Sequence, residues 1–574
     1  MKTIIYYLKP FFKRMSLGLF IKILGTLVEL ALPYILSHIL KNVVVTQQIS
    51  QILLWGGAMI ACAGMACLCN IIANRMAARV ARNFSENVRH DLFDKTMRLS
   101  PAQTDAFTIP SLESRITTDT YNLHSFVGMM QRLGVRAPIL LVGGIAITLI
   151  MDSFLALSII AVLPFIFVTV YFISKKGVPL YQKVQKSVDG MIRVVREDTQ
   201  GIRVIKALSK TEYEHRRYDS VNKNLVHDEK KAGITMGAVN PIMTLLMNSG
   251  IVAVVALAAN RVANHQSDPE TVIAFMQYFT LISMAMMSVT RMFVMFSKSS
   301  ASANRIAEVL DTKDDLTVKS ENQYPAKKTD AFITFENVSF SYKGKRNNLE
   351  NISLSVPRGG SLGIIGATGS GKSTLVKLLI RFYDVTSGAI RIDGRDIRTI
   401  AREEFFKKFG IAMQHDFLYA DTVEENIKFG RELSHEDVVR AAKIAQADDF
   451  IQAFPEGYEH MLSQKGTNVS GGQKQRILIS RAVAARPEIL ILDDSSSALD
   501  YKTDANLRRA LAENLTDTTV ITVAQRVSSV KNCDVILVLD EGRIIGLGTH
   551  DELMVTCPEY KEISDSQMGG TIVE

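Results

Sequence analysis

Long apolar stretches dominate the first half of this chain and limit what it can fold into. There are six of them, at about residues 16–40, 52–74, 133–151, 153–173, 238–260 and 271–296. A helix of about 20 mostly apolar residues is long enough to cross the hydrocarbon core of a bilayer. We therefore expect the first half to be an α-helical domain that crosses a membrane six times.

The links between these stretches differ in length and charge. Those near 41–51, 151–153 and 261–270 are short and carry almost no Lys or Arg, whereas those near 75–132 and 174–237 are long and basic. Basic links stay in the cytoplasm, so the long links and, with an even number of spans, both termini are expected there.

Both long links show helical apolar spacing, which predicts helix pairs that extend well beyond the membrane. Such pairs would reach a soluble domain. The candidate tips of the two pairs are residues 110–115 and 201–207.

The charge of the chain indicates a membrane surface. The formal net charge is +8 over 574 residues. Lys and Arg fall mostly between the apolar stretches, so membrane lipids explain the charge better than nucleic acid, and we expect no nucleic-acid partner. The five cysteines form no metal spacing with histidines, which favours reduced packing residues.

Two features of the apolar stretches are candidates for contact with a hydrophobic ligand. Glu29 lies in the middle of the first stretch, and an intramembrane carboxylate is expensive enough to suggest a function. The sixth stretch is rich in flexible thioethers, which suit varied apolar ligands. They are Met276, Met284, Met286, Met287, Met292 and Met295. An interhelical hydrogen bond for Glu29 and ordinary helix packing for the methionines remain open.

The second half contains a glycine-rich stretch that follows a strand pattern and precedes a helix pattern. Its residues are Gly366, Ala367, Thr368, Gly369, Ser370, Gly371, Lys372, Ser373 and Thr374. They fit G-x-x-x-x-G-K-[ST], in which backbone N–H groups surround the phosphates of a nucleoside triphosphate. Lys372 reaches the β- and γ-phosphates, and the Ser373 hydroxyl can ligate Mg²⁺.

An acidic pair ends another apolar strand pattern in this half. The run 489–492 leads directly into Asp493 and Asp494. A buried strand that ends in Asp beside a phosphate loop is the usual partner for nucleotide-bound Mg²⁺, so Asp493 is a candidate metal ligand. Strand and helix patterns alternate over residues 330–574, which predicts an α/β domain.

Residues 330–560 resemble the nucleotide-binding domain of an ATP-binding cassette (ABC) protein. The residues similar to the family signature are Ser470, Gly471, Gly472 and Gln473. Asp493 matches the Walker B aspartate, Gln414 the Q-loop, and Ser497 to Asp500 the D-loop. Tyr342 occupies the position that stacks on adenine. The resemblance implies ATP and Mg²⁺ as cofactors, with Gln414 among both the metal ligands and the catalytic residues.

The whole chain resembles a half-transporter of the type IV exporter class. We expect a transmembrane domain over 1–311, a linker over 312–329 and an ABC nucleotide-binding domain, an α/β P-loop domain, over 330–574. The resemblance implies a transporter ATPase that works as a dimer by alternating access. Two ATP molecules are then sandwiched between two cassettes, and each site borrows the signature of the other cassette.

Two residues depart from the family pattern. Asp494 stands where a glutamate usually acts as general base, and Gln525 stands where a histidine contacts the γ-phosphate. The shorter carboxylate is held back by about 1.5 Å, and a misplacement of about 1 Å can cost roughly 10²-fold in rate. Glutamine cannot bring positive charge to the transition state. We therefore expect this site to bind ATP and hydrolyse it poorly.

These departures resemble one subunit of the heterodimeric bacterial multidrug exporters. The signature is nearly intact, with Val469 where leucine is usual, so it would serve the site of a second, non-identical half-transporter. The resemblance implies export of hydrophobic or amphipathic compounds across the bacterial cytoplasmic membrane.

Two other interpretations are kept open. One is an exporter of lipids or peptides. The other is a regulatory membrane protein that binds ATP without pumping, which the nearly intact signature disfavours.

Overall fold

The computed structural model describes most of the chain as two compact units. The described residues are 2–264, 268–342, 344, 346–414, 417–495 and 498–568. The first unit joins residues 1–97 to 108–312, and the second joins residues 98–107 to 313–574. The short segment 98–107 thus groups with the unit that contains the glycine-rich stretch, although in sequence it lies between the second and third apolar stretches.

Long helices build the first unit, and each predicted apolar stretch overlaps one of them. They are α2 (Phe12–His38), α3 (Ile49–Arg98), α6 (Thr120–Met151), α7 (Ser153–Gln200), α10 (Val239–Ala263) and α11 (Pro269–Leu310). Among the described residues, five helical segments are long and apolar enough to cross a membrane, and Ser153–Thr169 at the start of α7 is a shorter apolar helix. The prediction of an α-helical membrane domain is confirmed.

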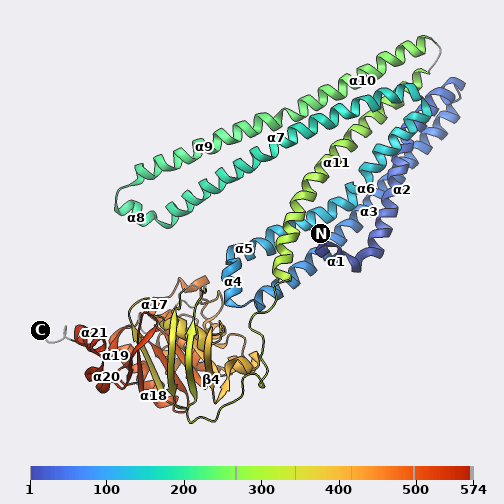
Figure 1. Ribbon diagram of the computed structural model, residues 1–574. Helices are drawn as coiled ribbons and strands as arrows, with labels where there is room; N and C mark the ends of the chain where they lie inside the picture. The colour runs from blue at the N-terminus through green and yellow to red at the C-terminus, as the bar shows by residue number, and fades with distance from the viewer. Residues whose placement is uncertain are drawn as a thin grey trace. The chain divides into compact units, whose positions relative to one another are not determined.

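Helices α7 and α9 (Thr211–Gly237) form one of the predicted extended pairs. They run side by side, and the short helix α8 (Ile202–Ala207) closes the tip (Figure 1). The Asp228 carboxylate joins the two helices, because it accepts hydrogen bonds from Lys183 Nζ at 2.7 Å and Ser187 Oγ at 2.8 Å. The tip predicted at residues 201–207 is confirmed.

The other predicted tip is wrong. Residues 110–115 begin within α5 (Ile109–Ser114), and Pro110 occupies the first turn of that helix. A proline is tolerated there because the first N–H groups of a helix have no intrahelical partner. The chain instead breaks between Arg98 and Pro101, where α3 ends and α4 (Pro101–Phe107) begins.

A buried polar network joins α6 to α11 in the first unit. It starts at a π-helical turn, η4 (Arg115–Asp119), whose last residue has a side chain only 1% exposed. The Asp119 carboxylate accepts a hydrogen bond from Ser302 Oγ at 2.8 Å and pairs with the Arg305 guanidinium. Asn122 Nδ2 donates to Ser302 Oγ at 3.0 Å. These bonds join the two helices through buried polar side chains.

Two sheets form the centre of the second unit. The first has the order β2-β1-β4-β5 and is antiparallel. Its strands are β1 (Ile333–Phe340), β2 (Leu349–Val356), β4 (Ser387–Ile392) and β5 (Arg395–Asp396). The second has the order β10-β9-β3-β8-β7-β6 and is parallel except for β10. Its strands are β3 (Ser361–Gly366), β6 (Phe409–Ala412), β7 (Ile489–Asp493), β8 (Thr519–Val523), β9 (Val535–Asp540) and β10 (Arg543–Gly548).

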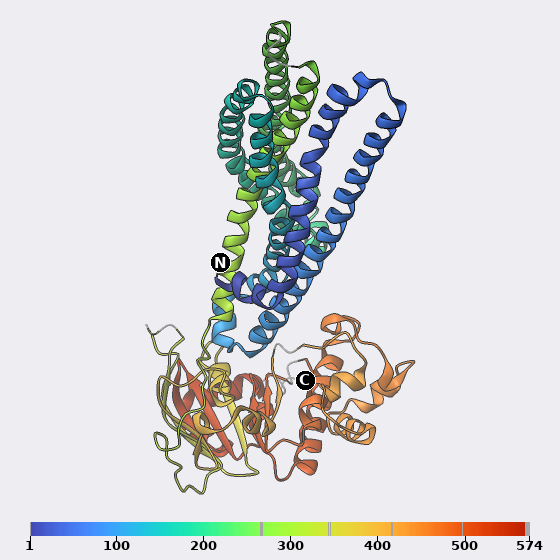
Figure 2. The ribbon, with the colours of Figure 1, turned by 90° about the vertical axis from the view of Figure 1, so that its right-hand side faces the viewer.

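The parallel strands of the second sheet place polar residues at a common edge. Gly366 ends β3, Asp493 ends β7, and Gln525 follows β8 by two residues. Ligands of open α/β sheets bind outside the carboxyl ends of such strands. Helices α14 (Val423–Lys428) and α15 (His435–Ile444), orange in Figure 2, lie to one side of the sheets. The predicted α/β fold is confirmed.

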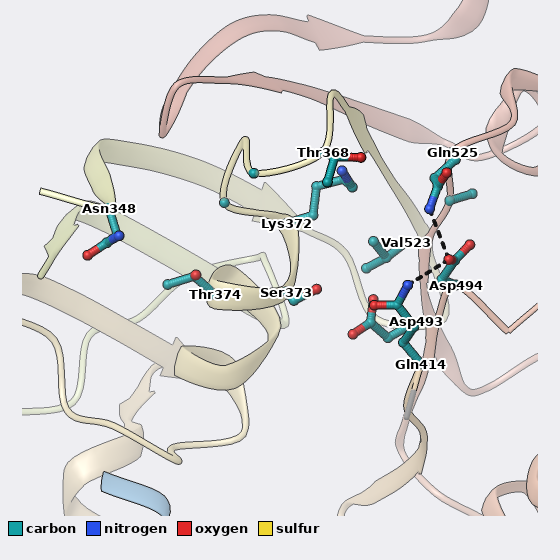
Figure 3. Close-up of a pocket in the computed structure, with 13 residues that line it drawn as sticks. Asn348, Thr368, Lys372, Ser373, Thr374, Gln414, Asp493, Asp494, Val523 and Gln525 are labelled. Atoms are coloured by element: carbon teal, nitrogen blue, oxygen red, sulfur yellow. Dashed lines mark hydrogen bonds between the residues drawn. The ribbon is translucent and has the colours of Figure 1, made fainter. Parts of the chain in front are cut away.

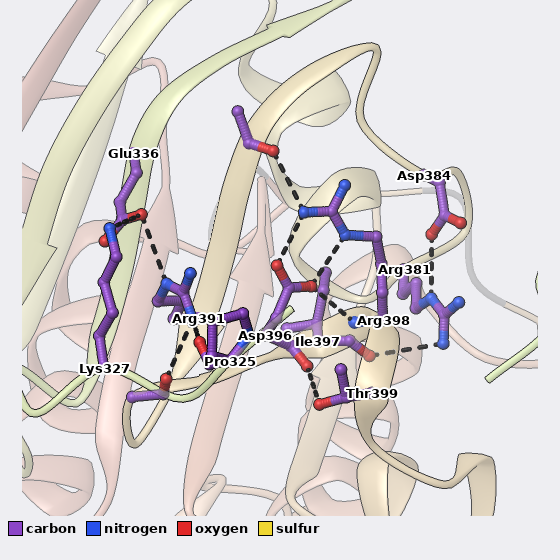
Figure 4. A network of polar contacts seen from close by, with 12 residues as sticks. Pro325, Lys327, Glu336, Arg381, Asp384, Arg391, Asp396, Ile397, Arg398 and Thr399 are labelled. Atoms are coloured by element: carbon purple, nitrogen blue, oxygen red, sulfur yellow. Dashed lines mark hydrogen bonds and ion pairs between the residues drawn. The ribbon is translucent and has the colours of Figure 1, made fainter. Parts of the chain in front are cut away.

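The polar stretch before β1 is hydrogen-bonded to the second unit along its length. Arg381 Nη2 donates to the Thr317 carbonyl at 2.7 Å. Arg391 Nη1 donates to the Pro325 carbonyl at 2.8 Å, as Figure 4 shows. The Lys319 backbone N–H donates to the Arg398 carbonyl at 2.8 Å. These bonds hold the stretch against the sheet, so it does not behave as a free tether.

Candidate functional site

The glycine-rich stretch folds as a tight loop between β3 and α12 (Lys372–Leu379). Gly371 has φ of +106°, which a residue with a side chain rarely adopts. A Cβ atom at Gly366 would lie 2.1 Å from the Leu539 carbonyl oxygen, so only glycine fits between the loop and β9. These two glycines explain why the loop needs its sequence pattern.

This loop forms one wall of a pocket at the carboxyl edge of the parallel sheet (Figure 3). The pocket has a volume of about 200 Å³. Its predicted residues are Thr368, Gly369, Gly371, Lys372, Ser373, Thr374, Gln414, Asp493, Asp494 and Gln525. Residues from distant parts of the chain therefore meet where the sequence patterns predict a nucleotide site.

Lys372 is the cation of the pocket. Its ammonium donates hydrogen bonds to the carbonyl oxygens of Gly366 at 2.9 Å and Ala367 at 2.8 Å. Burial lowers the pKa of Lys372, and the nearby carboxylates of Asp494 and Asp493 act in the opposite direction. A charged ammonium half-enclosed in this way gains from an anionic ligand, because phosphate oxygens would replace weaker carbonyl acceptors.

Ser373 of the loop and Asp493 at the end of β7 provide oxygen atoms that lie close to each other in the pocket. Burial raises the pKa of Asp493, the adjacent Asp494 raises it further, and a hydrogen bond with Ser373 opposes both effects. Two neighbouring buried carboxylates favour a cation between them. Hydroxyl, carboxylate and amide oxygens are the ligands that Mg²⁺ prefers, so the donor set of Ser373, Asp493 and Gln414 fits this ion.

Asp494 is held by two glutamine side chains (Figure 3). Gln414 Nε2 and Gln525 Nε2 each donate to Asp494 Oδ2, both at 3.0 Å. The backbone is fixed as well, since Asp494 has φ of +51° and its N–H donates to the Val523 carbonyl at 2.9 Å. One carboxylate oxygen thus carries two amide donors, and the backbone leaves it little freedom to advance into the pocket.

Tyr342 lies beside the pocket, and its ring is 41% exposed. Its hydroxyl donates to Thr374 Oγ1 at 3.3 Å, and its backbone N–H donates to Asn348 Oδ1 at 3.1 Å. Asn348, Val523 and Ala524 line the pocket and were missed by the sequence analysis. An asparagine in a loop between two strands has no distinctive pattern, and Val523 and Ala524 look like ordinary core residues.

The remaining predicted residues lie outside the described lining of this pocket. Ser470 caps α17 (Gly471–Ala484) in a capping box with Gln473, and Gly472 follows in the first turn. Asp500 caps α18 (Tyr501–Asn514) by accepting a hydrogen bond from the Thr503 N–H at 2.9 Å. Ser497, the first D-loop residue, lies outside the described residues.

Three residues of the loop itself also lie outside that lining. Gly366 and Ala367 accept the Lys372 hydrogen bonds. Ser370 is buried, and its hydroxyl oxygen has no hydrogen-bond partner among the described residues.

Comparisons with known proteins agree with this geometry. Residues 15–286 match the family described as the ABC transporter transmembrane region, and residues 349–497 match the ABC transporter family. The chain is 32% identical to an uncharacterized ABC transporter ATP-binding protein of Mycobacterium tuberculosis (strain CDC 1551 / Oshkosh), over 98% of this chain and 97% of that protein. It is also 32% identical to an uncharacterized ABC transporter ATP-binding protein of Bacillus subtilis (strain 168), over 99% of both.

A solved structure has the same fold. The structure of a bacterial Atm1-family ABC exporter with ATP bound has a TM-score of 0.81 and 24% sequence identity to this chain. The likeness covers 96% of this chain and 98% of that one. The architecture is therefore that of an ABC exporter.

Fold and pocket together define a membrane-embedded ATPase with a helical membrane domain and an α/β cassette. The chain belongs to the ABC transporter family, and its activity is ATP-driven transport.

Proposed function

We propose that this chain is the slow-site half of a heterodimeric exporter of hydrophobic or amphipathic compounds in a bacterial cytoplasmic membrane. The observation that carries the proposal is the arrangement around Asp494, where a short carboxylate is held by two glutamine amides at 3.0 Å. Both termini and the long helix pairs would lie in the cytoplasm, because the links that hold the pairs are basic.

The pocket would bind ATP with Mg²⁺. Backbone N–H groups of the loop and the Lys372 ammonium would hold the phosphates. Ser373, Asp493 and Gln414 would hold Mg²⁺, which neutralises charge on the β- and γ-phosphates when bound. Tyr342, with a ring that is 41% exposed beside the pocket, would stack on the adenine.

Hydrolysis at this site would be slow for three reasons. A general base must lie within hydrogen-bond reach of the attacking water, and the Asp494 carboxylate is one methylene shorter than the glutamate usual in this family. Its Oδ2 atom also already accepts two hydrogen bonds. Gln525 can donate a hydrogen bond but brings no positive charge to the transition state.

A second half-transporter would complete the exporter. The signature residues Ser470 to Gln473 lie outside the described lining of this chain's own pocket, which suits a role in a neighbouring site. The tip of the α7–α9 pair also presents exposed apolar side chains, Val204 in α8 at 61% and Leu208 just after α8 at 63%, and a partner would cover them. The partner would be a non-identical half-transporter that carries the glutamate and histidine missing here.

ATP hydrolysis by the purified chain alone and with its partner tests this proposal. We expect the chain alone to bind ATP and turn it over at least about 10²-fold more slowly than the complex. Brisk hydrolysis by the chain alone would refute the slow-site assignment. A complex in which both sites turn over equally would refute it as well.

A further inference from the structure

A cavity in the membrane part of the first unit combines one carboxylate with apolar side chains. It lies between α2, α10 and α11 and has a volume of about 480 Å³. Leu32, Met276 and Leu281 give it an apolar lining, and Glu29, Gln277 and Thr280 add polar groups. Cavities of roughly 300–1,000 Å³ with this mixture are typical of small-molecule sites.

The structure thus brings together two candidates that the sequence analysis treated separately. Glu29 lies in the first apolar stretch and Met276 in the sixth, and both line this one cavity. The other methionines of the sixth stretch are not among the described lining residues. A flexible thioether next to a polar group can adapt to ligands of different shape.

The charge around the cavity disfavours a cationic ligand. The Glu29 carboxylate is paired with the Arg136 guanidinium, with Nη2–Oε1 at 2.5 Å and Nε–Oε2 at 3.2 Å. The one carboxylate of the described lining is therefore already paired with a cation. A lipophilic cation would have to compete with Arg136 for Glu29.

The same arrangement disfavours an anionic ligand at the cavity wall. The Arg136 guanidinium is already paired with the Glu29 carboxylate. The Lys22 ammonium donates hydrogen bonds to Asn70 Oδ1 at 2.6 Å and to Asn74 Oδ1 at 3.2 Å. The charged group that lines the cavity is the Glu29 carboxylate, which would repel an anion.

Gln277 is the group that remains available for recognition. Its amide makes no hydrogen bond with any described residue, whereas the Thr280 hydroxyl donates to the Met276 carbonyl at 3.0 Å. An amide can both donate and accept, so it can hold an uncharged polar group such as a carbonyl, hydroxyl or amide.

We propose that this cavity binds uncharged amphipathic compounds whose polar group hydrogen-bonds to Gln277, and that such compounds are the transported class. The inference rests on the proposed export function and narrows its substrates. Leu32, Leu281 and Met276 would contact the apolar body of the ligand, and the Glu29–Arg136 pair would exclude lipophilic cations.

Binding of the uncharged dye Nile red tests the site directly. Full-length protein in lipid nanodiscs would be titrated by fluorescence without nucleotide. Gln277→Leu keeps the size of the side chain and removes one hydrogen-bonding group, so we expect the affinity to fall about three- to tenfold. Met284→Leu, at an exposed position of α11 outside the cavity lining, is the matched control and should leave affinity unchanged.

A competition with tetraphenylphosphonium tests the charge argument. The wild-type protein should bind this cation at least about tenfold more weakly than Nile red. Arg136→Gln should strengthen cation binding, because it leaves the Glu29 carboxylate without its partner. Equal binding of both probes by the wild type, or no effect of Gln277→Leu, would overturn the proposal.

The binding test and the slow-site test fail separately. The titration contains no nucleotide, so it is unaffected if the chain alone proves to be a fast ATPase. Nile red that binds through Gln277 but is not exported by vesicles of the complex would refute the transport role while the slow-site assignment stands.

Discussion

The Tyr383 hydroxyl donates a hydrogen bond to the Asp105 carboxylate at 3.1 Å. Asp105 belongs to α4, the segment between two spanning helices that groups with the cassette unit. The Tyr383 ring lies 5.1 Å from the Tyr342 ring in an edge-to-face arrangement, and Tyr342 lies beside the phosphate pocket. One tyrosine of the cassette unit thus touches both α4 and the tyrosine expected to hold the nucleotide base.

Tyr383→Phe removes this hydrogen bond and keeps the ring. We expect ATP affinity to be unchanged and substrate-stimulated ATP hydrolysis to fall by up to about tenfold, the equivalent of one hydrogen bond to a charged acceptor near the surface. The measurement compares nucleotide binding with stimulated ATPase activity of the complex. An equal loss of ATP affinity and stimulated hydrolysis would mean that Tyr383 supports only the nucleotide site. If neither quantity falls, the hydrogen bond to Asp105 does not contribute to ATP hydrolysis.

Restoring the family residues should accelerate this site. Asp494→Glu extends the carboxylate by one methylene, and Gln525→His adds a group that can carry positive charge, so the double variant should turn over at least about tenfold faster. ATP turnover would be measured in a complex whose partner has lost its own phosphate-loop lysine. Asp494→Glu alone tests how much of the gain needs the longer side chain.

A double variant that binds ATP but turns over no faster would contradict this prediction. The limit would then lie in groups that the double variant leaves in place, such as Gln414, whose amide donates a hydrogen bond to the carboxylate at position 494 in the wild type.

Local patterns predicted that the loop and the strand ends contribute residues to one pocket, because short motifs placed at strand ends meet at the same edge of a parallel sheet. Gly366 to Thr374 needs only strand, loop and helix in succession, and Asp493 needs only to end another parallel strand of the same sheet. The positions that the sequence did not reveal depend on contacts between distant residues. Asn348 reaches the pocket through a loop between β1 and β2, and α4 joins the cassette unit through bonds such as Gln103 Nε2 to the Lys313 carbonyl at 2.7 Å.

The α6–α11 network predicts a loss of stability in Asp119→Asn. The variant keeps the shape of the side chain but replaces a carboxylate, only 1% exposed, that pairs with Arg305 and accepts from Ser302. Breaking a buried pair and leaving its partner uncompensated is strongly destabilising, and Arg305 is half exposed here, so we expect about 1–3 kcal/mol. Thermal unfolding of the purified protein measures it.

An exposed pair provides the matched control for this variant. Glu541→Gln removes the partner of Arg346 at 3.7 Å, where both side chains are about four-fifths exposed. Such a pair contributes at most about 1 kcal/mol, so the unfolding temperature should hardly change. Equal effects of Asp119→Asn and Glu541→Gln would show that the buried network does not stabilise the α6–α11 contact.

Acid should weaken the contact between β1 and the stretch before it. Hydrogen bonding to Lys327 and the nearby Arg391 guanidinium lower the pKa of Glu336, despite the opposing effect of burial.

A depressed carboxyl pKa contributes stability that is fully present above the unfolded pKa, about 4.3, and is lost as pH falls through the lower folded value. Glu336→Gln should therefore be less stable than wild type at pH 7, and the difference should vanish once the pH has fallen below the lowered pKa of Glu336. Because the Glu336 side chain is 29% exposed, solvent screening limits the effect to about 1 kcal/mol or less. Thermal unfolding of both proteins from pH 7 to the acid limit measures it, and a constant difference at all pH values would show that Glu336 acts through packing and not through its charge.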